Sequence, residues 1–153
     1  MLSSTRRFPT KPLVLGGTFL TDSSANHLCR GDGNPHTLTM ETDSETLLKH
    51  GLILANKNFD QFQKELNIKK ENIDLVLTHQ VGSAHEAQSL ATLNLKNHPT
   101  FKTYPHLGNT GSSALPLTLI EAFEKNKINP NDTVAMLGIG SGLVSFMLGV
   151  QWK

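Results

Sequence analysis

The chain has 153 residues, of which 37% are hydrophobic and 18% charged, and its formal net charge at pH 7 is +1. This length fits one domain, because a single hydrophobic core stops growing only beyond about 250 residues. The composition excludes a disordered chain and a fibrous repeat. The nearly balanced charge argues against nucleic acid as a partner.

The cysteine usage and the hydropathy pattern indicate a cytoplasmic protein. Cys29 is the only cysteine, so an intrachain disulfide cannot form, and no secretory signal pattern opens the chain. The most apolar segment, 134–150, is interrupted by glycines and serines and is too polar to cross a membrane. We therefore expect no membrane span.

The amino-terminal third is predicted to be a loose arm followed by short strands. Residues 1–12 combine basic residues and prolines with little apolar periodicity. Residues 13–22 are rich in β-forming residues, and the Gly16-Gly17 pair predicts a bulge or a close backbone approach. Residues 23–35 have turn composition, and 36–42 is a second candidate strand.

A long amphipathic helix is predicted next. Thr42 and Glu45 have capping-box spacing, which makes the Thr42 hydroxyl the expected N-cap. Apolar residues then recur every three or four positions from Leu47 to Leu66, and Asn67 is expected to end the helix.

The remaining residues alternate between strand and helix patterns. Residues 74–78 form a continuous apolar run, typical of a strand that is covered on both faces. A second capping box at 83–86 opens a helix to about Leu95. The further predicted elements are a strand at 101–106, a helix at 112–126, and strands at 133–137 and 144–152. This order predicts an α/β fold, with a mixed, mostly parallel five-stranded sheet and helices packed on it.

Three predicted loops follow strands at the carboxyl edge of this sheet, where ligands bind in open α/β folds. They contain His79, Asn109 and the glycine-rich stretch 138–142. An imidazole, a carboxamide and free backbone amides are neutral donors suited to an oxyanion. Together they predict a site that polarises a carbonyl group.

Each component also has an ordinary interpretation. His79 could make a structural hydrogen bond at a strand end, and Asn109 could serve only the turn. The stretch 138–142 lacks the spacing of a dinucleotide-binding loop and of a serine-hydrolase elbow. No histidine has metal-ligand spacing, so no metal is expected, and Cys29 is expected to be a small buried residue.

Three motifs together resemble one enzyme family: HQVGSAH at 79–85, LGNTGSSALPL at 107–117 and LGIGSGLVSFMLGVQW at 137–152. They are similar to the carboxyl-terminal half of the type III 3-oxoacyl-acyl-carrier-protein synthases, which have the thiolase fold. The sequences LLKHG at 47–51, HQVGSAH at 79–85 and GIGSGL at 138–143 most resemble the branch that includes the head-to-head acyl-CoA condensing enzymes of olefin synthesis.

The resemblance implies a Claisen condensation of acyl thioesters of coenzyme A or acyl carrier protein, which are substrates, with no cofactor. It places His79 and Asn109 on the thioester carbonyl oxygen, and it places the Ser141 amide, in a turn permitted by Gly140 and Gly142, in the oxyanion hole at a nucleophilic cysteine. That cysteine belongs to an upstream half which this sequence lacks, and Cys29 is not its equivalent.

Under the resemblance, residues 13–41 correspond to the end of the first half and 42–153 to the second half. A second half on its own should expose an apolar face, and we expect this face to bind a complementary cysteine-bearing half or a second copy. The alternative interpretation is a non-catalytic remnant that acts as an acyl-binding or interaction module.

Overall fold

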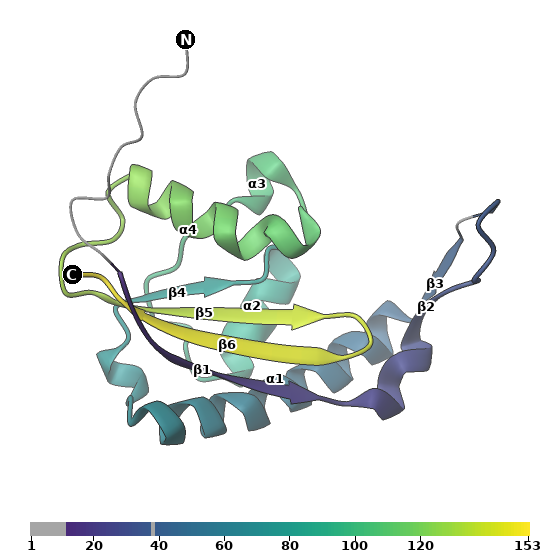
Figure 1. Ribbon diagram of the computed structural model, residues 1–153, viewed down its shortest axis with the longest axis horizontal. Helices are drawn as coiled ribbons and strands as arrows, with labels where there is room; N and C mark the ends of the chain where they lie inside the picture. Colours follow the sequence, from purple (N-terminus) through teal and green to yellow (C-terminus); the bar gives the residue numbers. More distant parts are fainter. Residues whose placement is uncertain (1–11, 38) are drawn as a thin grey trace, which may run out of the picture.

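The computed structural model describes residues 12–37 and 39–153, so all but the last residue of the predicted arm at 1–12 lies outside the described residues. Its main sheet has the order β1-β6-β5-β4, formed by Leu13–Thr21, Val144–Gln151, Thr133–Gly140 and Leu75–Thr78 (Figure 1). Among the described strands, β4 and β5 are the only pair that is parallel. The predicted α/β class and mixed sheet are confirmed, but the sheet has four strands and not five, and it is not mostly parallel.

The strand predicted at 101–106 is wrong for a physical reason. Thr100 makes a single bridge to Val76, after which the chain turns into the short helix α3, Tyr104–Leu107. The amides of Thr103 and Tyr104 both donate to the side chain of Gln80, at 2.8 and 3.2 Å. These donors are therefore not available to a strand ladder, and Pro105 has no amide proton to offer.

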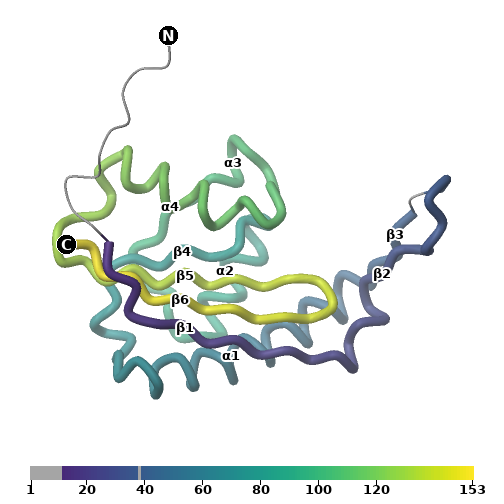
Figure 2. The backbone as a smooth tube through the Cα atoms, viewed as in Figure 1, coloured from purple at the N-terminus to yellow at the C-terminus, as the bar shows by residue number. Residues whose placement is uncertain are grey.

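The predicted strand at 36–42 is reduced to β3, Met40–Thr42, which pairs with β2, Cys29–Gly31, outside the main sheet. Figure 2 shows this hairpin projecting beyond the body of the molecule. A 3-10 turn, Ser23–Leu28, connects β1 to it. The predicted bulge in the first strand is confirmed, because the register shifts between Val14 and Gly16.

Neither predicted capping box forms: one helix is capped by the residue after the predicted cap, and the other has no side-chain cap. Helix α1, Ser44–Leu66, is capped by Asp43, whose carboxylate accepts from the Thr46 amide, whereas Thr42 stays paired in β3. Asn67 ends α1 in the left-handed conformation, as predicted. Helix α2, Ser83–Thr92, follows Gly82 and has no side-chain cap, so the second predicted capping box is wrong.

Helices cover both faces of the sheet (Figure 1). Helices α1 and α2 pack on one face through a cluster that includes Phe59, Phe62 and Leu90. Helix α4, Ala114–Glu124, follows a 3-10 turn at Gly111–Ser113 and packs on the other face. All four residues of β4 are buried, which confirms the prediction of a strand covered on both sides.

The α4 face of the sheet is only partly covered. Phe19 of β1 and Phe146 of β6 are cross-strand partners, and they are 61% and 41% exposed. Leu117 and Ile120 of α4 are also exposed. In the described part of the chain, no helix combines the length and apolar character that crossing a bilayer requires.

Candidate active site

The predicted site residues gather at the carboxyl end of β4 and β5. His79 directly follows β4, and its amide donates to the Leu137 carbonyl at 2.9 Å, which continues the parallel pairing by one residue. His79, Asn109, Gly140 and Ser141 line one pocket of about 440 Å³, together with Phe146 and residues of the α4 amino-terminal region. The structure thus brings four of the five predicted residues together.

A second pocket of about 300 Å³ adjoins the first. His79, Asn109, Gly140 and Ser141 line both pockets. Ile139 also lines both pockets, and the rest of the second pocket is largely apolar, with contributions from Met40, Leu47, Leu48, Val81 and Leu143. The imidazole and the carboxamide therefore lie where a pocket of mixed polarity meets an apolar recess.

The fifth predicted residue, Gly142, shapes the turn and does not line either pocket. Gly138–Gly140 belong to β5, so the reversal into β6 is made by Ser141, Gly142 and Leu143. Gly142 has a φ of 78°, a value that glycine adopts without strain. Leu143, the last residue of the turn, also has a positive φ, of 42°. The tight turn leaves Ser141 exposed at the pocket opening.

The Asn109 side chain stabilises a turn through its oxygen, and its Nδ2 group is left as a hydrogen-bond donor. Its side-chain oxygen accepts from the Gly111 amide at 3.0 Å, an interaction that fixes the orientation of the carboxamide. The Nδ2 group is at the other end of the same amide and carries two protons. The ordinary turn interpretation and the donor role consequently use different atoms and are compatible.

The His79 ring is half-buried, and among the described residues it has no hydrogen-bond partner. The ordinary interpretation, a structural hydrogen bond at a strand end, therefore finds no support there. Burial lowers the pKa of His79 below 6.5, and the nearby imidazole of His85 lowers it further. A neutral ring with one N–H donor thus predominates at pH 7.

We expect replacement of His85 by alanine to raise the pKa of His79 toward 6.5, because it removes one of the two causes that oppose protonation. In the wild type, the stability contributed by neutral His79 is present above pH 6.5 and is lost as the pH falls through the lower folded pKa. An NMR titration of the His79 ring proton measures the pKa, and urea unfolding at a series of pH values measures the stability. An unchanged midpoint in His85→Ala would contradict the electrostatic account.

Sequence reasoning missed two neighbours of the site. Cys29 is not fully buried as expected: it is half-buried, it borders the second pocket, and its pKa is lowered by hydrogen bonds with Ser141 and Thr42. The pairing of β2 with β3 brings it there, and no sequence motif indicates this. The second neighbour is Gln80, and the only sequence signal for it is its position next to His79. In the part of the chain that the structure describes, no three metal-ligating side chains converge.

Comparison with solved structures places this architecture among the condensing enzymes of the thiolase fold. The structure of 3-oxoacyl-(acyl carrier protein) synthase III, FabH, from Xanthomonas oryzae pv. oryzae matches 95% of this chain and 42% of its own, with a TM-score of 0.85 and 31% identity. A structure of OleA from Xanthomonas campestris matches equally well, with a TM-score of 0.85 and 31% identity over 95% of this chain and 42% of that one.

Sequence comparison identifies the family. Residues 63–152 match the family described as 3-Oxoacyl-[acyl-carrier-protein (ACP)] synthase III C terminal, and the chain belongs to this family. Acyl-CoA:acyl-CoA alkyltransferase of Shewanella oneidensis is 37% identical over 147 residues, which are 93% of this chain and 42% of that protein. The predicted resemblance is confirmed, and the chain spans about two fifths of the length of these relatives.

Proposed function

We propose that this chain supplies the carbonyl-binding part of an enzyme that joins two acyl thioesters by Claisen condensation. The observation that carries the proposal is the shared pocket of His79 and Asn109, in which the half-buried ring and the Nδ2 group are both without a protein acceptor among the described residues. The family of the chain supports the same reaction class.

In this mechanism the two side chains act on the thioester that becomes the carbon nucleophile. His79 and Asn109 donate hydrogen bonds to its carbonyl oxygen, which gains negative charge when the adjacent carbon loses carbon dioxide, or loses a proton to a base of the complementary half. Neutral donors fixed before reaction stabilise this enolate without reorganisation. The Ser141 amide, which lines the same pocket, stabilises the oxyanion formed when the enolate attacks the acyl-cysteine thioester. The carbonyl group then re-forms and the cysteine thiolate leaves.

The apolar recess beside His79 suits the hydrocarbon part of an acyl thioester. Leu47, Leu48 and Leu143 line it, and they would bury a chain whose thioester lies at His79. The OleA of Xanthomonas campestris has been solved with lauric acid and lauroyl-CoA bound. We propose an acyl-CoA or acyl-carrier-protein thioester as the substrate.

The acyl group is accepted by a cysteine of a complementary half in this proposal. His79 and Asn109 polarise a carbonyl but cannot hold an acyl chain, which needs a positioned thiolate. The pocket opens on the side of Asn109, Gly140 and Ser141, all of which are exposed, so a second protein surface can reach it. The exposed Phe19 and Phe146 provide an apolar contact for that half, and a second copy of this chain is the other occupant to be tested.

The test joins the part of the Shewanella alkyltransferase that this chain does not match to the complete chain, and we call the product the joined protein. Incubated with lauroyl-CoA, it is expected to release free coenzyme A and to form the coupled product, measured by a thiol reagent and by mass spectrometry. The chain alone is expected to do neither. Circular dichroism and gel filtration verify that the joined protein folds.

Three outcomes would overturn parts of this proposal. A folded joined protein that binds lauroyl-CoA without coupling it would favour the alternative, an acyl-binding module. Coupling by the chain alone, abolished by Cys29→Ser, would transfer the acceptor role to Cys29. Sedimentation showing a stable dimer of the chain, unchanged when the Shewanella part is present in trans, would assign the apolar face to self-association.

A further inference from the structure

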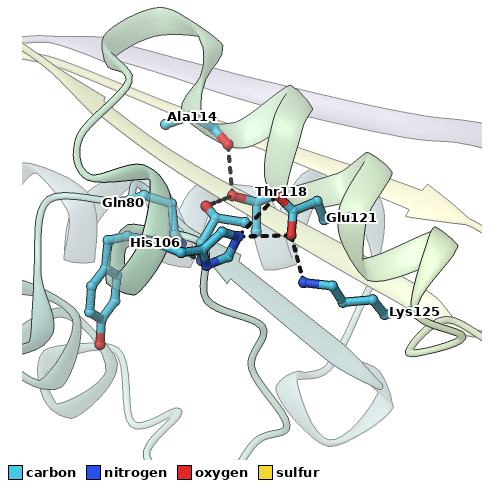
Figure 3. Close-up of polar contacts among 8 residues, drawn as sticks. Gln80, His106, Ala114, Thr118, Glu121 and Lys125 are labelled. Atoms are coloured by element: carbon cyan, nitrogen blue, oxygen red, sulfur yellow. Dashed lines mark hydrogen bonds and ion pairs between the residues drawn. The ribbon is translucent and has the colours of Figure 1, made fainter.

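Gln80 connects the strand that carries His79 to the loop that carries Asn109. Its side chain is 0% exposed. Its Nε2 group donates to the Thr78 carbonyl at 2.7 Å, and its oxygen accepts from the amides of Thr103 and Tyr104 at 2.8 and 3.2 Å. Figure 3 shows Gln80 beside the polar contacts that reach α4.

The bond to Thr103 and Tyr104 fixes the start of the segment that ends at Asn109. The carbonyl of Thr103 accepts from Leu107 at 2.9 Å, and that of Tyr104 accepts from Gly108 at 3.1 Å. These bonds close α3 into one compact turn, so its first and last residues move together. Gly108 follows α3 and Asn109 follows Gly108, so the position of Asn109 depends on where Gln80 holds the beginning of the turn.

Three further contacts hold α3 and the residue before it against the neighbouring helices. The Glu86 carboxylate of α2 accepts from the Tyr104 hydroxyl at 3.1 Å, and the Glu121 carboxylate of α4 contacts His106 Nε2 at 3.0 Å. Thr103 also bonds the Thr118 hydroxyl of α4 at 2.8 Å (Figure 3). These contacts fix α3 against α2 and α4, whereas Gln80 fixes it against β4, the strand that positions His79.

We propose that Gln80 is a positioning residue that sets the separation of the His79 ring and the Asn109 carboxamide. A side chain with both an acceptor and a donor is needed, because the loop offers two amides and the strand offers a carbonyl. An apolar residue of the same size leaves all three groups buried without partners. The catalytic importance of this separation rests on the proposed function. The effect of Gln80 on the separation is structural and does not depend on that function.

The test compares Gln80→Met with His98→Leu in the full chain. Methionine has a similar volume but removes all three bonds. In the control, His98→Leu removes the 2.8 Å contact between Nε2 and the Lys70 carbonyl, which lies before the amino end of β4. We expect NMR signals of the Asn109 side-chain amide and of the His79 ring to shift in Gln80→Met and to stay in place in His98→Leu, at matched circular dichroism.

Gln80→Glu provides the rescue. A protonated carboxyl group accepts from the loop amides and donates to the Thr78 carbonyl, so the Asn109 signals should return toward wild-type positions as the pH falls and the new group is protonated. In the joined protein, we expect Gln80→Met to reduce kcat about 10- to 100-fold and His98→Leu to leave it within about twofold.

Folded Gln80→Met with unshifted Asn109 and His79 signals would overturn the inference. So would failure of Gln80→Glu to recover these signals at any pH where it is folded. Neither result depends on condensation activity, so the inference and the proposed function fail independently.

Discussion

Replacing His79 with alanine is expected to reduce condensation by the joined protein about 100- to 1000-fold, the usual cost of removing one oxyanion donor. The ring forms no hydrogen bond with the described protein residues, so its removal deletes a donor to the substrate without breaking a structural contact. The free energy of unfolding at pH 7 should therefore change little. Rates are measured as coupled product formed from lauroyl-CoA.

The matched control for this substitution is His36→Ala. His36 is exposed in the loop of the β2-β3 hairpin, and its backbone amide, which alanine keeps, makes its hydrogen bond to Asn34. This variant should retain the wild-type rate. A His79→Ala protein that is as active as His36→Ala would remove His79 from the mechanism.

Replacing Asn109 with aspartate is expected to reduce the rate more than replacing it with alanine does. Aspartate keeps an oxygen for the Gly111 amide, so the turn persists, but it places an acceptor and a negative charge where the Nδ2 donor was. Loss of the donor alone costs about 100- to 1000-fold, and repulsion of the enolate adds to it. Rates of Asn109→Ala and Asn109→Asp in the joined protein measure the two contributions.

Asn56→Asp controls for the added charge, because Asn56 is exposed on α1 and lines neither of the two site pockets. It should be as active as the wild type. Should Asn109→Asp prove more active than Asn109→Ala, the side chain would act through the turn to Gly111, and the donor role would be wrong.

Much of the fold could be predicted because its signals are local. The unbroken apolar run of β4, the periodicity of α1 and the left-handed Asn67 each follow from a few adjacent residues. The same reasoning placed His79 and Asn109 at one edge of the sheet, because the carboxyl ends of neighbouring strands meet there. That argument holds for His79, which follows β4, but Asn109 follows the helix α3 and not the strand expected before it. Their shared pocket is observed, and their chemical roles stay predictions.

The errors come from contacts between residues far apart in the chain. Residues 101–106 have strand-like composition, but the amides of Thr103 and Tyr104 donate to the side-chain oxygen of Gln80 and so cannot pair with a neighbouring strand. The second capping box failed because Glu86 is buried against Lys102 and Tyr104, not turned back toward its own helix start. The position of Cys29 depends on a hairpin whose second strand begins at Met40. Local propensity does not contain such pairings.

The strand order has a consequence for biosynthesis. β1 is synthesised well before its partner β6, because Leu13 is aligned with Gln151. At typical ribosomal speeds of about 5–20 residues per second, the nascent β1 waits on the order of ten seconds for its partner. During that interval its backbone groups and Phe19 are open to other chains, so chaperone binding to the growing polypeptide should concentrate on this segment.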